Sequence, residues 1–249
     1  LFFFKFALKI LKKNKIKTNY YSEDDRPTTN KNSYIVNKHK LLKVDELNNN
    51  TITNSTLDKI IKSLKKDKNQ ILVFSDFRHG IFNNQTLSKI FESINHKTFK
   101  VADSQVASRW GNISDFKNFD LLTPTEREAR YSLFEQDTPI RNLIGNLQKK
   151  SKANNIILKL GEKGLISISR KKNDYIALDP FVDNLVDSNG AGDALLAYSA
   201  STLYSTKSLI ISSIIGLLAA SCKCETQGNL PVTTDQIIEK INLLQKNYE

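Results

Sequence analysis

The sequence predicts an α/β fold built on a mostly parallel central sheet. Residues 71–74 (ILVF) and 156–160 (IILKL) are short, largely apolar runs of the kind that form strands covered on both faces. Residues 53–66 instead carry leucine and isoleucine at helical spacing. Because such strands and helices alternate along the chain, we expect helices to cover both faces of the sheet.

The chain is predicted to begin with a helix and a hairpin. Residues 1–11 indicate an amphipathic helix rather than a signal peptide, because Lys5 and Lys9 interrupt the apolar run and no small-residue cleavage site follows. Residues 34–36 and 41–44 are β-like runs on either side of a polar segment, which is typical of a hairpin. The elements expected next are a helix at 53–66, a strand at 71–74, a helix at 87–94 and strands at 98–102 and 119–123.

The second half of the chain is predicted to contain further strands, with helices before and after them in the sequence. The elements expected there are helices at 126–134 and 140–150, strands at 156–160, 165–170 and 175–178, and helices at 191–204 and 208–222. A last helix is expected after Thr233, because Thr233 with Gln236 three residues later has the pattern of a capping box.

Composition excludes several classes of protein. The 249 residues are 39 % hydrophobic with thirteen Phe, which is enough for a core and excludes wholesale disorder. No apolar run approaches the ~20 residues of a membrane span. The net charge of +11 would suit nucleic acid, an anionic membrane or a phosphorylated small molecule. Because the lysines are dispersed along the chain, we interpret them as a solvated surface and expect neither a nucleic-acid nor a membrane partner.

Cysteine and histidine usage bears on location and on metals. Cys222 and Cys224 give no disulfide framework, which favours a reducing compartment and predicts a cytoplasmic protein with inert thiols. The three histidines are scattered and do not have the spacing of a zinc site.

The segment 187–193 (DSNGAGD) is the strongest chemical signal in the chain. Its small residues precede a predicted helix, where Gly190, Ala191 and Gly192 would present backbone N–H groups to an anion. Asp193 would then accept the proton of a hydroxyl beside a phosphoryl group. The alternative is a glycine-containing loop in which the aspartate only caps the helix.

Five segments, taken in order, resemble those of the ribokinase-like (PfkB) carbohydrate kinases. The signature D-T-T-G-A-G-D of that family resembles 187–193, T-P-N-x-x-E resembles 121–128 (LLTPTERE), and T-L-G-x-x-G resembles 159–164 (KLGEKG). Two further segments are similar to those of the heptose 7-phosphate kinase branch, namely 75–80 (SDFRHG) and 26–31 (RPTTNK) followed by 41–45 (LLKVD). The resemblance covers residues 8–244.

The resemblance implies a three-layer ribokinase-like fold with a small β lid, and a role for each matching residue. Asp193 would be the catalytic base, with Gly190, Ala191 and Gly192 as the anion hole for the γ-phosphate of ATP. The residues implied for other ligands are Glu128 and Asp187 for metal, Lys159, Gly161, Gly164, Ala220 and Gly228 for the nucleotide, and Arg26, Lys31 and Asp76 for the substrate.

The implied function is an ATP- and Mg²⁺-dependent kinase of a sugar or sugar phosphate, such as a heptose 7-phosphate. The resemblance further implies a homodimer formed through the lid at 27–45 and a fused or neighbouring nucleotidyltransferase. Thr125 replaces the asparagine of T-P-N-x-x-E and Asn189 replaces a threonine of the signature, where some members hold a monovalent cation. These departures favour an alternative, a non-catalytic sugar- or nucleotide-binding relative.

The resemblance also predicts that the chain is incomplete at its N-terminus. The family begins with a strand and Gly-rich segments that hold the sugar, and residues 1–11 correspond to a helix that follows them. We therefore expect 1–249 to be a single carbohydrate-kinase domain without its first strands.

Overall fold

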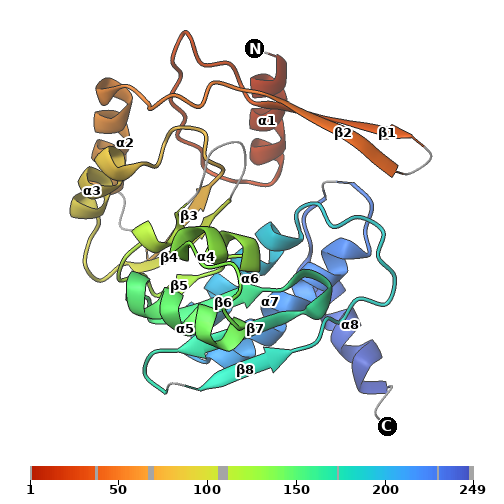
Figure 1. Ribbon diagram of the computed structural model, residues 1–249. Coiled ribbons are helices and arrows are strands. Elements are labelled where there is room, and N and C mark those ends of the chain that lie inside the picture. The colour runs from red at the N-terminus through yellow and green to blue at the C-terminus, as the bar shows by residue number, and fades with distance from the viewer. Residues whose placement is uncertain are drawn as a thin grey trace. The chain divides into compact units, whose positions relative to one another are not determined.

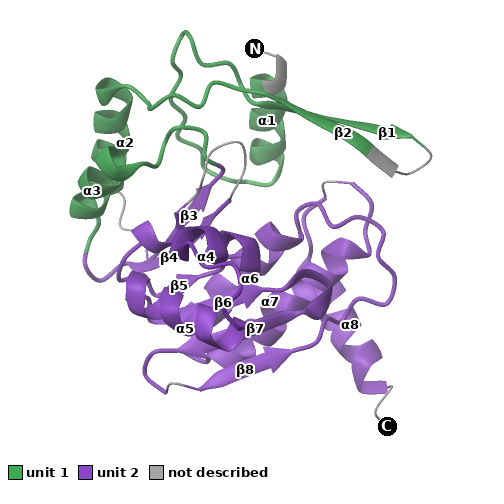
Figure 2. Ribbon diagram, in the orientation of Figure 1, with its two compact units in different colours: residues 1–68, 78–95 green, residues 69–77, 96–249 purple. Residues whose placement is uncertain are grey.

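The computed structural model describes residues 2–36, 39–66, 70–105, 112–172, 174–228 and 230–246. The chain divides into two compact units (Figure 2). Unit 1 comprises Leu1–Lys68 and Arg78–Asn95, and unit 2 comprises Asn69–Phe77 and His96–Glu249. The single domain expected from the sequence stays a prediction.

A six-stranded mixed sheet forms the centre of unit 2 (Figure 1). Its strands, in spatial and chain order, are β3 (Ile71–Asp76), β4 (Phe99–Ser104), β5 (Leu121–Leu122), β6 (Asn155–Lys159), β7 (Leu165–Ser169) and β8 (Tyr175–Leu178). The first four pair in parallel and the last two are antiparallel. The mostly parallel sheet predicted from the sequence is thus confirmed.

Helices cover both faces of this sheet and make unit 2 three layers thick (Figure 1). The helices α4 (Glu126–Leu133) and α5 (Ile140–Ser151) pack on β6, whereas α6 (Ala191–Thr206) and α7 (Leu209–Cys224) pack on the other face, and α8 (Thr234–Lys246) packs on α7. Ile157 belongs to the core cluster with α6 and α7, so the alternation of a strand directs Ile156 and Leu158 to the α4–α5 face. All three are fully buried, which explains why this strand is apolar on both faces.

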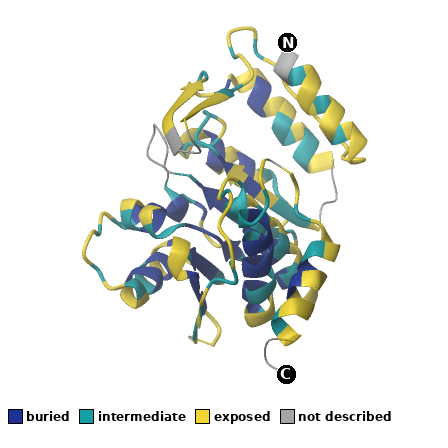
Figure 3. Ribbon diagram, turned by 90° about the vertical axis from the view of Figure 1, so that its right-hand side faces the viewer, coloured by how far each residue is buried: buried dark blue, intermediate teal, exposed yellow. Residues whose placement is uncertain are grey.

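Unit 1 holds a two-stranded hairpin and three helices. These elements are α1 (Phe2–Lys13), β1 (Asn30–Val36), β2 (His39–Glu46), α2 (Asn54–Lys66) and α3 (Asn84–Ser93). The hairpin is antiparallel, and nearly all of its described side chains are exposed, as its yellow colour in Figure 3 shows. Two strands alone bury little on either face, which explains the exposed Tyr34, Ile35 and Leu41.

The predicted helices and strands are present, with informative differences at their ends. Helix α3 begins three residues before the predicted 87–94, because Asn83 and Thr86 form a capping box. Strand β5 is limited to two residues because Pro124, which lacks an N–H, follows shortly after it. The capping box of Thr233 and Gln236 is confirmed. The hairpin turn at 37–38 lies outside the described residues, and no described helix is long and apolar enough to cross a membrane.

Candidate functional site

The carboxyl ends of the parallel strands gather polar side chains at one edge of the sheet. Strand β3 ends at Asp76, strand β4 carries Asp103 and Ser104 at its end, and strand β6 ends at Lys159. Parallel strands place their carboxyl ends together, and ligands of open α/β sheets bind at that edge. The sheet topology alone therefore assembles a group of buried charges and hydroxyls there.

An ion pair between Asp103 and Lys159 lies at the centre of this edge. The ammonium Nζ of Lys159 is 3.0 Å from Oδ1 and 3.2 Å from Oδ2 of Asp103. Only 7 % of the Asp103 side chain and 13 % of the Lys159 side chain are exposed. Thr123 adds a hydroxyl 3.3 Å from the same carboxylate. The pair is thus largely removed from water. In such surroundings each charge depends strongly on the other for its stabilisation.

The segment at 121–128 is held against the end of β6 by its backbone. The amide of Lys159 donates to the carbonyl of Pro124 at 2.8 Å, and Thr125 forms an isolated parallel bridge with Lys159. Helix α4 then starts in a capping box, in which Thr125 Oγ1 accepts from the Glu128 amide and Glu128 Oε2 accepts from the Thr125 amide at 2.7 Å. These bonds bring two segments that are separate in the sequence into one site.

Glu128 is a buried carboxyl beside the Asp103–Lys159 pair. It is 8 % exposed. Its pKa is raised above 4.5, mainly because burial removes water from the charged form; Lys159 acts against this rise and Asp103 adds to it. Two carboxyl groups and one ammonium group therefore interact at this edge of the sheet.

The start of helix α6 lies next to Lys159. Gly190 adopts the left-handed conformation with φ 83° at the N-cap, where no side chain caps the helix. A Cβ placed on Gly192 would lie 3.3 Å from Lys159 Nζ, so the first turn passes directly over the ammonium group. Asp193 lies in that first turn and is exposed. The amide of Ala191 closes a turn onto the Ser188 carbonyl at 3.2 Å, so this expected anion-hole donor is engaged within the loop.

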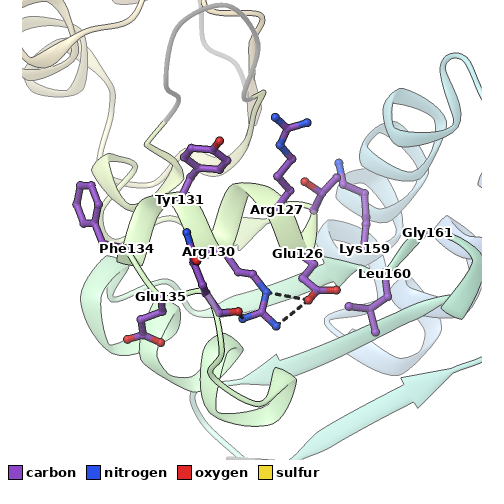
Figure 4. A pocket seen from close by; sticks show the side chains of 11 residues that line it. Glu126, Arg127, Arg130, Tyr131, Phe134, Glu135, Lys159, Leu160 and Gly161 are labelled. Carbon is purple, nitrogen blue, oxygen red and sulfur yellow. Dashed lines mark hydrogen bonds and ion pairs between the residues drawn. The ribbon is translucent and has the colours of Figure 1, made fainter.

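A cavity of about 980 Å³ opens between α4 and the end of β6 (Figure 4). Its lining residues are Thr125, Glu126, Arg127, Arg130, Tyr131, Phe134, Glu135, Gln136, Lys159, Leu160 and Gly161. Figure 4 shows Lys159 and Gly161 at one end of the cavity and Tyr131 and Phe134 at the other. Arg130 is held by Glu126 along the helix at 2.7 Å, whereas the guanidinium of Arg127 lies over the Tyr131 ring, 5.7 Å from its centroid.

Two glycines of the 159–164 segment have different surroundings. Gly161 lines the cavity, with no heavy atom within 4 Å of where a Cβ would lie, which leaves room for a ligand. Gly164 is buried at φ 74°, and a Cβ there would lie 2.0 Å from the Leu178 carbonyl oxygen. The structure therefore explains Gly164 by packing against the end of β8, and its contact with a nucleotide stays a prediction.

The residues expected near the adenine lie around the end of α7. Ala220 packs against the core cluster beneath α6 and α7. Gly228 is exposed with φ 82°, and its carbonyl accepts from the buried Lys223 ammonium at 2.7 Å. Neither contact shows a nucleotide, so both roles stay predictions.

The expected metal residues are not gathered in one cluster. Among the described residues, no group of three or more His, Cys, Asp or Glu could hold a metal ion. Asp187 shapes the loop before α6, where its Oδ1 accepts from the Asn189 amide at 3.0 Å. Glu128 and Asp103 nevertheless fit Mg²⁺, because this ion binds through one or two carboxylates and completes its shell with water and phosphate oxygens.

The expected substrate residues have partners within their own units. Asp76 is buried in unit 2 and accepts from the Ser104 hydroxyl at 2.8 Å. Lys31 lies on the exposed β1 of unit 1, opposite Asp45. The guanidinium of Arg26 donates to the carbonyls of Asn48, Asn50 and His79 and to the Glu23 carboxylate, which ties three loops of unit 1 together.

Sequence reasoning missed Asp103, Thr123 and Arg127. Asp103 follows the buried Val101 and Ala102, and an acid that ends an apolar strand is the signal that could have identified it. The expected strand stopped at Ala102, so the acid fell outside it.

The chain resembles known proteins over nearly its whole length. The pattern of the pfkB family carbohydrate kinases matches residues 2–235. The chain belongs to the pfkB family. The bifunctional protein HldE of Aliarcobacter butzleri is 25 % identical over 245 residues, which is 96 % of this chain and 50 % of that protein. The bifunctional protein HldE of Sulfurimonas denitrificans is 25 % identical over 92 % of this chain and 48 % of that protein.

Two solved structures of sugar kinases share the fold. Ribokinase from Thermotoga maritima has a TM-score of 0.75 at 18 % identity, covering 96 % of this chain and 77 % of that one. Phosphofructokinase-2 from Escherichia coli has a TM-score of 0.75 at 15 % identity, covering 97 % and 78 %. The ribokinase-like fold is thus confirmed, whereas the chain spans about half the length of the curated relatives it matches.

Proposed function

We propose that the chain is an ATP-dependent sugar kinase whose phosphoryl-transfer site lies at the carboxyl edge of the sheet in unit 2. The observation that carries this proposal is the meeting of the GAGD turn with the Lys159–Asp103 pair, since Gly192 passes over the Lys159 ammonium. An uncapped helix start attracts anions, and the ammonium adds a fixed positive charge beside it.

The reaction follows from where the charges lie. The sugar hydroxyl oxygen attacks the γ-phosphorus of ATP, and the bond from that phosphorus to the bridging oxygen breaks to release ADP. The exposed carboxylate of Asp193 accepts the hydroxyl proton in the proposed step. The backbone amides of Gly190 and Gly192 and the Lys159 ammonium stabilise the negative charge of the transferring group in the proposed step.

Glu128 and Asp103 are the proposed residues that hold Mg²⁺, through water. When bound, Mg²⁺ would neutralise phosphate charge, as it does in other phosphoryl transfers. Asp103 is suited to change partner, because its carboxylate binds Lys159 and lies close enough to Glu128 to raise the pKa of that carboxyl. Arg127, which lines the same cavity as Lys159, offers further positive charge to the nucleotide phosphates.

The proposed acceptor is a phosphorylated sugar such as a heptose 7-phosphate. Its support is the resemblance of 26–31 and 75–80 to the heptose 7-phosphate kinase branch, together with two HldE relatives at 25 % identity. Lys31, Arg26 and Asp76 are the substrate residues that this resemblance supports. A nucleotidyltransferase partner is proposed because those relatives are named bifunctional, and a homodimer is proposed through the exposed apolar hairpin.

The test of the proposed chemistry compares the wild type with Asp193→Asn. Sugar-dependent ADP release should fall at least about 10³-fold in the variant, because the proton acceptor is lost, whereas ATP affinity should change less than about threefold. Asp235→Asn, a change of an acid in the first turn of another helix, is the matched control and should keep full turnover. Sugar-dependent ADP release by Asp193→Asn at the wild-type rate would refute the assignment.

A second candidate is a non-catalytic member of the family that binds sugar or nucleotide. The observation in its favour is the capping box, which commits one Glu128 oxygen to the Thr125 amide. Calorimetry with ATP beside a turnover assay separates the two candidates. ATP binding without turnover of any of a panel of free sugars and sugar phosphates identifies the binding protein, and turnover identifies the kinase.

A further inference from the structure

A second cavity, of about 780 Å³, lies in unit 2 along one face of α5. Its lining residues are Thr138, Arg141, Asn142, Gly145, Asn146, Gln148, Lys149, Lys152, Ile168, Arg170 and Tyr175. The helical members recur every three or four residues, so the cavity follows the helix. Ile168 of β7, Tyr175 of β8 and three residues just outside these elements, Thr138, Lys152 and Arg170, complete the lining. We call it the α5 cavity.

The α5 cavity lies at the opposite end of the sheet from the proposed kinase site. Arg170 follows Ser169, which pairs with Asn155 at the amino end of β6, and Tyr175 pairs with Ile168 nearby. Lys159 lies at the other end of β6, about 13 Å away along a strand. The α5 cavity therefore does not belong to the site described above.

Positive charge dominates the lining. Arg141, Lys149, Lys152 and Arg170 contribute cations, and no carboxylate is among the eleven described residues that line the cavity. The carboxylate of Glu135, outside this lining, accepts from the side-chain amide of Asn146 at 3.2 Å. The described lining thus presents four cations, several amide groups and no carboxylate to a ligand that enters.

Helix electrostatics explain only half of these cations. Lys149 and Lys152 lie at the C-terminal end of α5, where the helix dipole favours positive charge. Arg141 lies in the first turn, where the same dipole disfavours it, and Arg170 follows a strand. The two arginines therefore require another explanation.

Arg141 and Arg170 are exposed residues, and each guanidinium group has one contact with the protein. Arg141 lies over the ring of Tyr175, with 4.8 Å from its Cζ to the ring centroid, which is a cation–π contact. Arg170 donates to the carbonyl of Lys152 at 3.4 Å. Gly145 leaves room for the Tyr175 hydroxyl, since a Cβ there would lie 3.3 Å from it. Guanidinium groups that are already oriented lose little entropy when they bind an anion.

We propose that the α5 cavity binds a small ligand with at least two phosphate groups. Arginine binds phosphate through two parallel hydrogen bonds, and lysine adds a point charge. Arg141 lies over Tyr175 of β8 and Arg170 bonds to the backbone of Lys152 after α5, so the two guanidinium groups have different supports, which suits phosphates that are separated within one ligand. The volume falls within the ~300–1,000 Å³ of small-molecule sites. This inference does not depend on the proposed kinase activity.

The test is calorimetric titration of the whole chain with inorganic tripolyphosphate in the absence of Mg²⁺. Lys159→Gln with Asp103→Asn is used as the background, so that binding at the proposed kinase site is weakened and no Asp103 charge is left buried without its partner. In this background, Arg141→Gln with Arg170→Gln should raise the Kd for tripolyphosphate at least tenfold. Lys117→Gln with Lys246→Gln removes the same charge from exposed positions elsewhere and should change the Kd less than twofold.

Three results would overturn the proposal. The first is no heat of binding up to millimolar tripolyphosphate in the background that lacks both Lys159 and Asp103. The second is an unchanged Kd in the double arginine variant, and the third is an equal loss of affinity in the lysine control. If circular dichroism shows that the double arginine variant is unfolded, Lys149→Gln with Lys152→Gln is tested in its place. That pair should raise the Kd at least threefold, and an unchanged Kd would again overturn the proposal.

Discussion

Replacement of Lys159 by methionine should destabilise unit 2 by about 3–4 kcal/mol. At 3.0 Å, two unit charges attract with about 5 kcal/mol at an effective dielectric constant of 20. Part of this attraction offsets the loss of water around the two groups. Removing one partner of a buried pair costs about 3–5 kcal/mol, because the other charge is left buried without compensation. The value for Lys159 is at the lower end, because 13 % of its side chain is exposed.

The double variant Lys159→Met with Asp103→Asn isolates the pair. Both charges are absent, so no carboxylate is left uncompensated, and Thr123 can still bond to the new amide. The double variant should therefore be about 2 kcal/mol more stable than Lys159→Met alone. Urea unfolding followed by far-ultraviolet circular dichroism measures each free energy of unfolding, from the transition that belongs to unit 2.

The prediction fails if Lys159→Met lies within about 1 kcal/mol of the wild type. That result would mean that water compensates Asp103 and that the edge of the sheet is not a low-dielectric site. It also fails if the double variant loses the sum of the two single changes, because the two side chains would then act independently. Lys117→Met, an exposed lysine of the same unit, is the matched control and should change stability by less than about 0.5 kcal/mol.

Three further variants test other features of the structure. Because burial raises the Glu128 pKa above 4.5, the free energy of unfolding should fall as the pH rises through that raised pKa; Glu128→Gln should lack this fall in thermal melts from pH 4 to 8. Gly164→Ala should cost at least about 2 kcal/mol in urea unfolding, because its φ is positive and a Cβ would collide with Leu178. Burial acts against ionisation of Glu23, but hydrogen bonds from Thr56, Thr53 and Arg26 lower its pKa to about 2. Glu23→Gln should therefore lower the free energy of unfolding by about 1–2 kcal/mol at pH 7. In thermal melts this difference from the wild type should shrink as the pH falls from 4.5 towards 2.

The sequence was sufficient for the elements of the sheet but not for the pairing of charges across it. Apolar runs located β6 and β7, because burial on both faces leaves a strong local pattern. The run at 71–74 also located β3, but its expected cover on both faces was wrong, since β3 is an edge strand and Val73 is 43 % exposed. The register that brings Asp103 beside Lys159 depends on β5 lying between their strands. No local pattern records that arrangement, since the two residues are 56 positions apart.

The resemblance located the GAGD turn correctly at the start of α6, because a run of small residues before a helix is a local feature. It could not distinguish binding residues from packing residues. Arg26 was expected at the substrate, and in the structure its guanidinium holds three carbonyls and Glu23 within unit 1. Its contact with a substrate stays a prediction, as does that of Gly164 with the nucleotide.

The two ends of β6 and its neighbours carry different electrostatics, and this difference separates their proposed roles. At the carboxyl end, Lys159 is matched by Asp103 and faces Glu128, so a phosphate that arrives there competes with carboxylates unless a divalent cation accompanies it. Phosphoryl transfer with Mg²⁺ requires that balance, because the ion needs oxygen ligands. Around the amino end, Arg141 and Arg170 face a cavity without a lining carboxylate, so a phosphate can bind there without a metal. Mg²⁺ should therefore strengthen the binding of tripolyphosphate at the Lys159 site and weaken it at the α5 cavity.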